Sequence, residues 1–319
     1  MALYLVTGGA GFIGSHITTA LVARGDRVRV LDSLVSGASE NLEHLEVDGL
    51  DSGAPVEFLR GDVRDEASCE EACRGVVGVF HEAAQVSVPA SVEDPEESFA
   101  VNVTGTLRIL EAARAAGVER VVFAASSAAY GDDPSLPKVE SQIPNPLSPY
   151  AAGKVAGESL MSVWGSVYGM KTVSLRYFNV FGPRQADDSP YSGVIAIFAR
   201  RLLEGKLPAI HGDGEQTRDF VFISDVVRAN LAAMGTDCEP GEVFNVGTAH
   251  SISVNELLRT MAEIAGLEGD PEHLPSRSGD VRHSRASIDR IRSRLGYEPE
   301  TDLREGLEET LAWYRARVS

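Results

Sequence analysis

Hydrophobic and polar positions follow one repeating pattern through the first half of the chain. Short apolar runs, rich in β-branched residues, occupy positions 3–6, 28–31, 56–59, 76–81, 121–124 and 172–175, and longer stretches of helical character separate most of them. Continuously apolar strands are typical of a parallel sheet that is covered by helices on both faces. The pattern therefore predicts an α/β fold built on a doubly wound parallel sheet.

A glycine-rich segment directly follows the first apolar run. Gly9, Gly11 and Gly14 have the G-x-G-x-x-G spacing, in which glycine permits a tight turn, close approach of a pyrophosphate and close packing of the next helix. The helix expected at 15–24 would begin with free N–H groups facing the phosphates. The predicted dinucleotide-binding positions of this turn are Gly8, Gly11, Phe12, Ile13 and Gly14.

Asp32 ends the second predicted strand, eighteen residues after Gly14. A carboxylate at that place accepts hydrogen bonds from the adenosine ribose and repels a 2′-phosphate. The alternative is an aspartate that only begins a turn, but the complete strand–turn–helix–strand unit favours the ribose contact. NAD, rather than NADP, is the predicted cofactor of this Rossmann unit.

Beyond Phe178 the pattern becomes irregular. Glycine and proline interrupt the chain at 182–183, 189–190, 212–214 and 271–275, while the apolar run 243–246 resembles a further strand of the sheet. We predict a Rossmann domain over residues 1–178, with a return strand near 243–246. Residues 179–319 would mainly form a smaller, interleaved substrate-binding lobe.

Tyr150 and Lys154 stand four residues apart at the start of a helix that we expect to reach about Tyr168. This spacing places both side chains on one helix face. An ammonium beside a phenol stabilises the phenolate, so the tyrosine can act as a base nearer neutral pH. Alone, such a pair is usually a solvated helix surface; after a dinucleotide fingerprint it indicates catalysis.

Two serines can supply the hydroxyl that completes such a site. Ser126 and Ser127 follow the run 121–124, at the carboxyl edge of the predicted parallel sheet, where sheets of this kind bind ligands. A hydroxyl there can reach both a substrate oxygen and Tyr150. A turn-forming serine pair is the structural alternative. The catalytic candidates are therefore Ser126, Ser127, Tyr150 and Lys154.

Charge and cysteine content narrow the choice of partners. The net charge of −18 disfavours nucleic acid and anionic membranes. Three cysteines, no signal-type start and no long apolar span fit a reducing cytoplasm. Cys69, Cys73 and the histidines lack companions at ligand spacing, so no metal is predicted. His81, which ends a buried strand, is expected to be structural.

The ordered motifs carry a resemblance over nearly the whole chain. The chain resembles the extended short-chain dehydrogenases/reductases, and within them the nucleotide-sugar 4-epimerases of the UDP-galactose and UDP-N-acetylglucosamine type. Besides the glycine turn and Ser148-Pro149-Tyr150, the matching motifs lie at 62–63, 81–84, 102–106, 125–131, 176–179, 218–220 and 279–282.

The resemblance implies roles for residues on both sides of the cleft. Asp62 and Val63 would meet the adenine, and Lys154 would also hold the nicotinamide ribose. The other cofactor-lining positions would be Ala83, Ala84 and Asn102.

On the substrate side, the resemblance implies that Arg218 and Arg277 grip the UDP diphosphate, for which guanidinium groups are well suited. Asp280 would bind the uridine ribose, and Arg282 is a further phosphate candidate. The remaining nucleotide contacts would come from Asn179, the backbone near Val194, and Phe220.

The activity implied is 4-epimerisation of a UDP-hexose. Tyr150 would take the proton of the sugar 4-hydroxyl while a hydride passes from C4 to NAD, and the 4-keto sugar would turn over before it is reduced. Ser284 corresponds to one wall of the sugar pocket in the resembling epimerases, and Gly193 lies near another. Because both are small, N-acetylated UDP-hexoses would be accepted as well as UDP-glucose and UDP-galactose.

Other readings remain open. The related decarboxylases and 4,6-dehydratases carry acidic residues just after the catalytic hydroxyl, where this chain has Ser127, Ala128 and Ala129. The UDP-glucuronate 4-epimerases tend to have threonine and arginine at the positions of Asn179 and Ala186. A non-catalytic NAD-binding regulator would not need the Ser, Tyr and Lys set. The resemblance also implies a homodimer that pairs through helices near 99–115 and 150–167.

Overall fold

A single parallel sheet of eight strands forms the centre of the molecule. The computed structural model describes residues 1–186, 193–275 and 281–318. The strand order is β12-β7-β6-β5-β1-β2-β4-β3, and every neighbouring pair is parallel. The strands are β1 (Leu3–Thr7), β2 (Arg27–Asp32), β3 (Val47–Asp48), β4 (Val56–Arg60), β5 (Gly78–His81), β6 (Arg120–Ser126), β7 (Lys171–Tyr177) and β12 (Glu242–Val246). All seven predicted strands are confirmed, including the return strand, and only the short edge strand β3 was missed.

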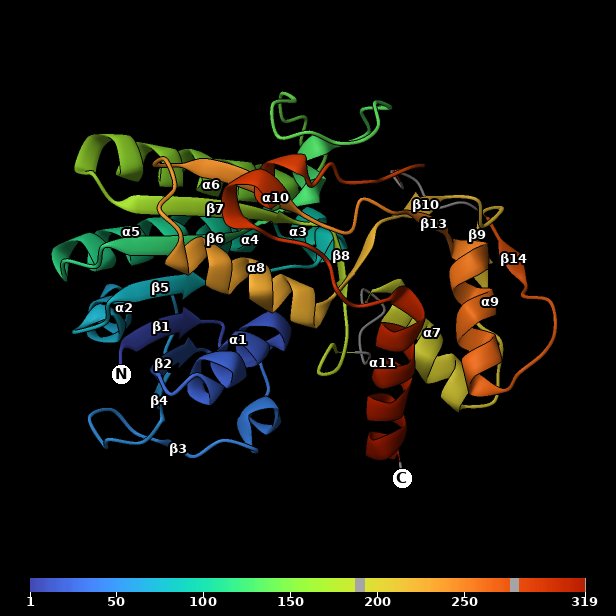
Figure 1. Cartoon of the computed structure of the whole chain (residues 1–319), viewed down its shortest axis with the longest axis horizontal. Coiled ribbons are helices and arrows are strands. Elements are labelled where there is room, and N and C mark those ends of the chain that lie inside the picture. The colour runs from blue at the N-terminus through green and yellow to red at the C-terminus, as the bar shows by residue number, and fades with distance from the viewer. Residues whose placement is uncertain (187–192, 276–280, 319) are drawn as a thin grey trace.

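Helices cover both faces of the sheet (Figure 1). α1 (Phe12–Ala23) and α8 (Ile223–Gly235) pack on one face, and α2 (Glu66–Cys73), α5 (Thr106–Ala115) and α6 (Pro149–Tyr168) pack on the other. The doubly wound α/β class is therefore confirmed. The helix predicted near α1 begins three residues earlier than expected, at Phe12, because it starts inside the glycine turn itself.

The helix expected at 99–115 is interrupted. α3 (Val88–Glu93) and α4 (Pro95–Phe99) precede a π-helical stretch, Ala100–Gly105, and regular α5 begins at Thr106. Asn102, inside that stretch, turns its amide to the backbone of Gln85 through two hydrogen bonds. Wide turns of this kind often occur at functional sites, and here it brings a buried amide against the segment that follows β5.

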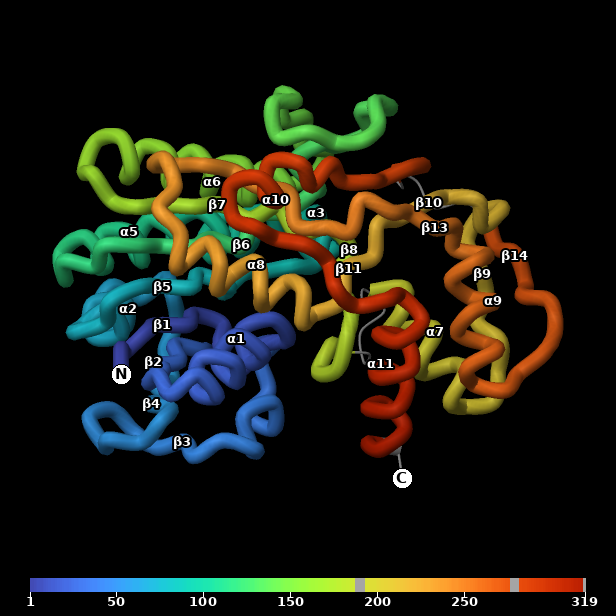
Figure 2. Tube along the Cα trace, viewed as in Figure 1, coloured from blue at the N-terminus to red at the C-terminus, as the bar shows by residue number. Residues whose placement is uncertain are grey.

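The second lobe lies beside the carboxyl ends of the strands (Figure 1). Its helices are α7 (Val194–Leu203), α9 (Val254–Ala265) and α11 (Leu303–Val318). Its strand pairs are β8 (Asn179–Phe181) with β11 (Phe220–Phe222), β9 (Ile210–His211) with β14 (His273–Leu274), and β10 (Thr217–Arg218) with β13 (Ile252–Ser253). The chain passes between this lobe and the sheet more than once. α8, β12 and α10 (Asp289–Leu295) lie with the sheet, although segments of the second lobe precede and follow them in the sequence (Figure 2). The lobe and the face covered by α1 and α8 share one apolar core.

One buried carboxylate joins three separate segments of this lobe. Asp219 accepts hydrogen bonds from the N–H groups of Thr248 (2.8 Å), Ala249 (3.1 Å) and Ala286 (3.0 Å), and from the Thr248 hydroxyl (2.8 Å). It lies between β10 and β11, so these bonds fix Arg218 against the turn after β12 and the segment before α10. The sequence motif at 218–220 predicted roles only for Arg218 and Phe220, not for Asp219.

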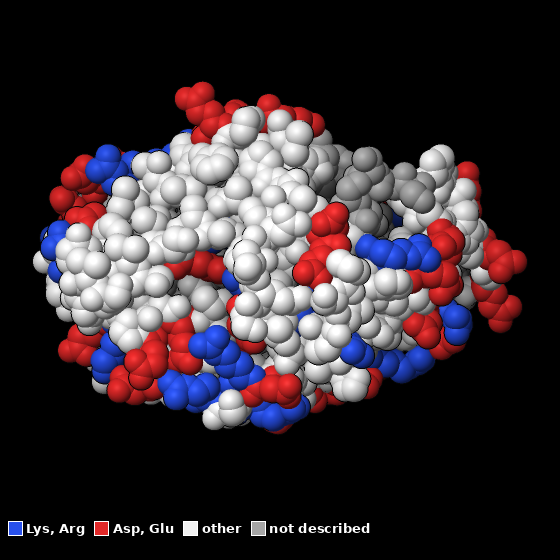
Figure 3. All heavy atoms as spheres, turned by 90° about the horizontal axis from the view of Figure 1, so that it is seen from above, with Lys and Arg blue, Asp and Glu red and all other residues white. Residues whose placement is uncertain are grey.

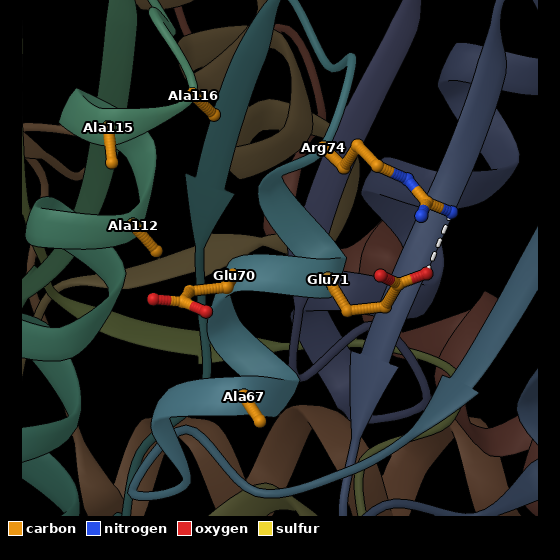
Figure 4. A pocket seen from close by; sticks show the side chains of 7 residues that line it. All are labelled: Ala67, Glu70, Glu71, Arg74, Ala112, Ala115 and Ala116. Carbon is orange, nitrogen blue, oxygen red and sulfur yellow. Dashed lines mark ion pairs between the residues drawn. The ribbon is translucent and has the colours of Figure 1, made fainter.

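The outer surface carries mixed charge. In Figure 3, Lys and Arg are interspersed with Asp and Glu, and a broad area between them carries neither. A groove of about 550 Å³ opens between α2 and α5, where Glu71 pairs with Arg74 (Figure 4). It lies at the amino edge of the sheet, opposite the edge where ligands of parallel sheets bind. No described helix has the length and apolar character required to cross a membrane.

The Asp219 junction generates a stability prediction. Asp219→Ala leaves several buried N–H donors without an acceptor, so the free energy of unfolding in urea should fall by roughly 3 kcal/mol. Glu263→Ala, which removes an exposed ion pair with Arg304, is the control and should cost about 1 kcal/mol or less. Equal losses in the two variants would show that the junction does not hold the lobe together.

Candidate active site

The glycine turn between β1 and α1 is shaped by close backbone contacts. The Gly8 carbonyl accepts from the Gly11 N–H at 2.9 Å, and a Cβ at position 14 would stand only 2.2 Å from that carbonyl oxygen. Gly8 has φ +65°, and a Cβ there would meet the Ala83 nitrogen at 2.8 Å. The first turn of α1 has no side-chain cap at Gly11. Its N–H groups are therefore available to an anion.

Asp32 lies at the end of β2 and is 7% exposed. Its carboxylate accepts from the N–H groups of Ala10 (2.9 Å) and Leu34 (2.8 Å). Each carboxylate oxygen can accept a second hydrogen bond, so the ribose contact remains possible. The carboxylate thus also fixes the glycine turn to the end of β2. The sequence did not predict this structural role.

The other predicted cofactor residues line the continuation of the same sheet edge. Val63 is buried, and Asp62 is ion-paired with Arg64 at 2.6 Å. Ala83 and Ala84 directly follow β5, next to the glycine turn. Behind them, buried Asn102 accepts from the Gln85 N–H (2.9 Å) and donates to its carbonyl (3.0 Å). Asn102 therefore supports the segment that follows β5 and borders the glycine turn.

Ser126, Tyr150 and Lys154 come together at the carboxyl edge of the sheet. α6 begins at this point because Ser148 caps it, accepting from the Ala151 N–H at 3.2 Å, and Pro149 occupies the first turn. The Ser126 hydroxyl lies near the Tyr150 phenol and acts to lower its pKa. Lys154 donates to the Ala124 carbonyl at 2.7 Å. The structure thus pairs Ser126 with the tyrosine, while Ser127 begins the following 3₁₀ turn.

Burial dominates the electrostatics of this pair. The Lys154 side chain, 3% exposed, has its pKa lowered by burial to about 8. Burial raises the pKa of Tyr150 above its ordinary value, and the Ser126 hydrogen bond acts in the opposite direction. The Lys154 ammonium is 6.0 Å from the centre of the Tyr150 ring. The lowering of the phenol pKa expected from the four-residue spacing is therefore outweighed in this structure by desolvation.

His81 occupies a structural position. Its ring nitrogens are hydrogen-bonded to the hydroxyls of Thr7 (2.7 Å) and Thr106 (3.0 Å), and burial lowers its pKa to about 3. A neutral imidazole of this kind ties β5 to β1 and α5. Among the described residues, no three side chains of His, Cys, Asp or Glu gather at metal-binding distance.

The expected substrate residues cluster around one bridge in the second lobe. Thr217 pairs with His283, and the Ser284 N–H donates to the Thr217 carbonyl at 3.1 Å. Ser284 is half-buried, and this bond places it next to Thr217, which precedes Arg218 in β10. Arg282 is exposed and forms a two-pronged ion pair with Asp213 at 2.7 and 2.8 Å. Its guanidinium is therefore engaged by the protein itself.

Two further elements complete the substrate side. Asn179 and Phe220 are paired in the β8–β11 ladder. Gly193 precedes Val194 at the start of α7, and a Cβ on Gly193 would lie 3.2 Å from the Gln185 amide nitrogen. Arg277 and Asp280 lie outside the described residues.

Several residues at the site were not found by sequence reasoning. The Ser91 hydroxyl accepts from the Tyr150 N–H at 3.1 Å and so fixes the first turn of α6. Glu82 and Tyr177 are hydrogen-bonded at 3.0 Å below the cleft. Glu82 could have been noticed in the sequence, because an acidic residue next to a buried apolar strand is uncommon. Nothing in the sequence around Ser91 indicates its contact with Tyr150.

Comparison with known proteins agrees with this geometry. Residues 4–247 match the model of the NAD dependent epimerase/dehydratase family. The chain belongs to that family. It is a UDP-hexose 4-epimerase-like member of the extended short-chain dehydrogenases/reductases, and NAD is its cofactor.

The similarity covers almost the full length of each relative. A UDP-glucose 4-epimerase of Mycolicibacterium smegmatis is 42% identical over 98% of both chains. The UDP-glucose 4-epimerase of Thermotoga maritima, solved with UDP-glucose, superimposes with a TM-score of 0.92 at 39% identity, covering 99% of this chain and 100% of that one. The Thermus thermophilus UDP-glucose 4-epimerase, solved with NAD, gives 0.86 at 42% identity, with 98% and 99% covered. A UDP-N-acetyl-alpha-D-glucosaminuronate decarboxylase of Bacillus cytotoxicus is 33% identical over 98% and 97% of the two chains.

Asp32 generates the prediction for cofactor choice. Asp32→Ala removes a ribose acceptor and a charge that repels a 2′-phosphate, so NAD affinity should fall roughly 10- to 100-fold and the preference over NADP should narrow. Calorimetric titration with each dinucleotide measures both effects. Asp48→Ala, an exposed carboxylate in β3, is the control. Unchanged NAD affinity would mean that Asp32 only fixes the glycine turn and does not contact the ribose.

Proposed function

We propose that this protein is an NAD-dependent 4-epimerase of UDP-hexoses that acts through a transient 4-keto sugar. The observation that carries the proposal is the grouping of Ser126 at the end of β6 with Tyr150 and Lys154 in the first turns of α6, at the sheet edge that also holds the glycine turn. A base, its hydroxyl partner and a dinucleotide site at one edge are the parts that reversible oxidation of a secondary alcohol requires.

The residues divide the chemistry between them. Tyr150 takes the proton of the sugar 4-hydroxyl and later returns one, and Ser126 orients that oxygen while Ser127 borders the same turn. Lys154, as a cation, favours the phenolate form of Tyr150. Bound NAD supplies a hydride acceptor for C4 and the hydride for the return step. Because no net oxidation occurs, the protein has to retain the cofactor throughout the cycle.

The UDP group would be held by the second lobe. We assign the diphosphate to Arg218 and Arg277, whose guanidinium groups suit it, and the uridine ribose to Asp280. Asn179, Phe220 and the start of α7 at Val194 would contact the nucleotide. A sugar held mainly through its UDP can turn over, which an epimerase needs.

Other reactions of the family fit less well. Ala128 and Ala129 occupy the positions after Ser127, so the carboxylate that supports elimination or decarboxylation in the resembling lyases is missing there. Asn179 and Ala186 depart from the pattern of the UDP-glucuronate 4-epimerases. Assays of UDP-galactose, UDP-N-acetylglucosamine and UDP-glucuronate on one preparation distinguish these reactions, and turnover of the glucuronate alone would overturn the proposal.

We also propose a homodimer that pairs through the helices covering one face of the sheet. Exposed apolar side chains support this pairing: Phe99 ends α4, Leu107 is on α5, and Val163, Val167 and Tyr168 are on α6. Apolar side chains grouped on neighbouring helices are typical of a protein contact.

Tyr150 provides the test of the catalytic assignment. Tyr150→Phe removes a single hydroxyl, so folding and NAD binding should persist while turnover of UDP-galactose falls about 10²- to 10⁴-fold. Tyr168→Phe, at the exposed end of the same helix, is the matched control and should retain full turnover. If the Tyr150 variant kept more than about a third of its activity, it would not be the base.

Ser284 provides the test of sugar selectivity. We expect the wild type to accept N-acetylated UDP-hexoses, and Ser284→Tyr to suppress their turnover while largely sparing UDP-galactose, because filling a pocket penalises the ligand that needs the volume. Steady-state kcat/KM on both substrate classes measures this, with Ser284→Ala as the control. No acetamido-sugar activity in the wild type, or equal slowing of both classes by tyrosine, would contradict the assignment.

A further inference from the structure

The turn that follows β8 reaches from the second lobe to α1 (Figure 1). It consists of Gly182, Pro183 and Arg184, and the backbone of Arg184 has φ +68°. A long side chain is uncommon in this left-handed region, and such a conformation persists only where its surroundings hold it. The contacts of Arg184 therefore indicate what this turn does.

The Arg184 guanidinium binds side chains of the nucleotide-binding half. Its Nη1 donates to Ser15 Oγ at 3.3 Å and to Thr19 Oγ1 at 3.1 Å, both on α1. Its Nη2 lies 3.2 Å from Nε2 of His44. A guanidinium can only donate, so this histidine nitrogen has to be the unprotonated one. Arg184 thus joins the second lobe to α1 and to the segment between β2 and β3.

A second contact joins the same turn to α1. His16 Nε2 lies 2.9 Å from the Pro183 carbonyl oxygen, which can only accept, so Nε2 carries the proton. Burial, followed by the charge of Arg184, lowers the pKa of His16 to about 4, so the ring is neutral at physiological pH. The His16 ring also meets Phe12 edge to face, with 6.0 Å between the ring centres. Pro183 is thereby connected to the residue at which α1 begins.

Both contacts act close to the expected pyrophosphate site. Ser15 is in the first turn of α1, and its N–H donates to the Gly11 carbonyl at 3.1 Å. The segment that contains His44 is itself bonded to the glycine turn, because the Asn41 amide donates to the Ala10 carbonyl at 2.9 Å. The turn after β8 is therefore connected to the glycine turn by two routes.

The other side of the turn after β8 is fixed within the second lobe. The Gln185 backbone carbonyl accepts from the Tyr314 hydroxyl of α11. The Gln185 side-chain amide donates to the Val180 carbonyl of β8 at 3.1 Å. Tyr314 is buried. The turn thus belongs to the second lobe, and its bonds to α1 connect the two halves of the molecule.

We propose that Arg184 is a positioning residue that clamps the second lobe onto α1 and so slows the release of NAD. A dinucleotide at the carboxyl edge of the sheet lies between α1 and the second lobe, because this lobe stands beside that edge (Figure 1). The two have to separate before the cofactor can leave, and the bonds of Arg184 and His16 oppose that separation. The inference rests on NAD as the cofactor and not on the sugar, so a failed epimerase assay leaves it intact.

Exchange of bound NAD measures this effect directly. Holoenzyme that carries ¹⁴C-labelled NAD is mixed with an excess of unlabelled NAD, and the label that remains on the protein is followed over time. Arg184→Ala should release the label roughly tenfold faster than the wild type, because bonds from a charged group are lost. Arg24→Ala, which removes an exposed ion pair at the other end of α1, is the matched control and should release the label at the wild-type rate.

Two further variants distinguish this role from simpler ones. Arg184→Lys keeps the charge but replaces the planar guanidinium by one ammonium, so it should recover only part of the retention. His16→Phe keeps an aromatic ring next to Phe12 and removes the bond to Pro183, so it should also speed release, by less than Arg184→Ala does. Because both contacts hold one turn, combining His16→Phe with Arg184→Ala should add little to the effect of Arg184→Ala alone.

An unchanged release rate in Arg184→Ala would overturn the inference, whatever the midpoint of that variant in urea, because a purely structural side chain affects stability and not cofactor exchange. Full recovery by Arg184→Lys would also contradict it, since the charge alone would then be sufficient. Multiplied effects in the combined variant would show that Arg184 and His16 act separately and do not form one clamp.

Discussion

The carbonyl oxygen of Gly8 leaves no room for a side chain at position 14, and the rest of the nucleotide site depends on that contact. A Cβ there would approach to 2.2 Å, so α1 can begin directly behind β1 only if the residue is glycine. This close start leaves the N–H groups of the first turn unpaired at the sheet edge. The same edge receives Asp32, which fixes the turn from β2, and Ala83, which borders it from β5. The shape of the nucleotide site thus follows from backbone packing.

The side chains that we propose to be catalytic are held by a second set of buried polar contacts. Ser91 fixes the backbone of Tyr150, Ser126 meets its hydroxyl, and Ala124 accepts from Lys154. Ser91 comes from α3 and the other two from the end of β6, and they meet the start of α6 at the carboxyl edge of the sheet. In the second lobe, Asp219 performs the corresponding task, because it ties the end of β10 to the segment that contains Ser284. The proposed site is therefore assembled from two parts of the fold, each positioned by buried hydrogen bonds.

The features that sequence predicted are those that are local in the chain. Apolar runs gave the strands, the glycine spacing gave the turn, and the four-residue interval of Tyr150 and Lys154 gave their common helix face. Long-range contacts were not predictable in the same way: nothing near Ser91 indicates that it meets Tyr150. Nor does the sequence indicate that Asn102, in the π-helical stretch before α5, bonds the backbone of Gln85. Spacing also says nothing about desolvation, which is why the expected lowering of the phenol pKa is outweighed by burial.

The fate of the hydrogen at C4 tests the central claim most directly. UDP-glucose carrying deuterium at C4 should be converted to UDP-galactose that retains the deuterium at C4, because the hydride leaves and returns at the same carbon without exchange. Nuclear magnetic resonance of the product, with the reaction run in ordinary water, measures the label. Retention in a product of inverted C4 configuration is the predicted result. Loss of the deuterium to water, or a product unchanged at C4, would contradict epimerisation through a transient 4-keto sugar.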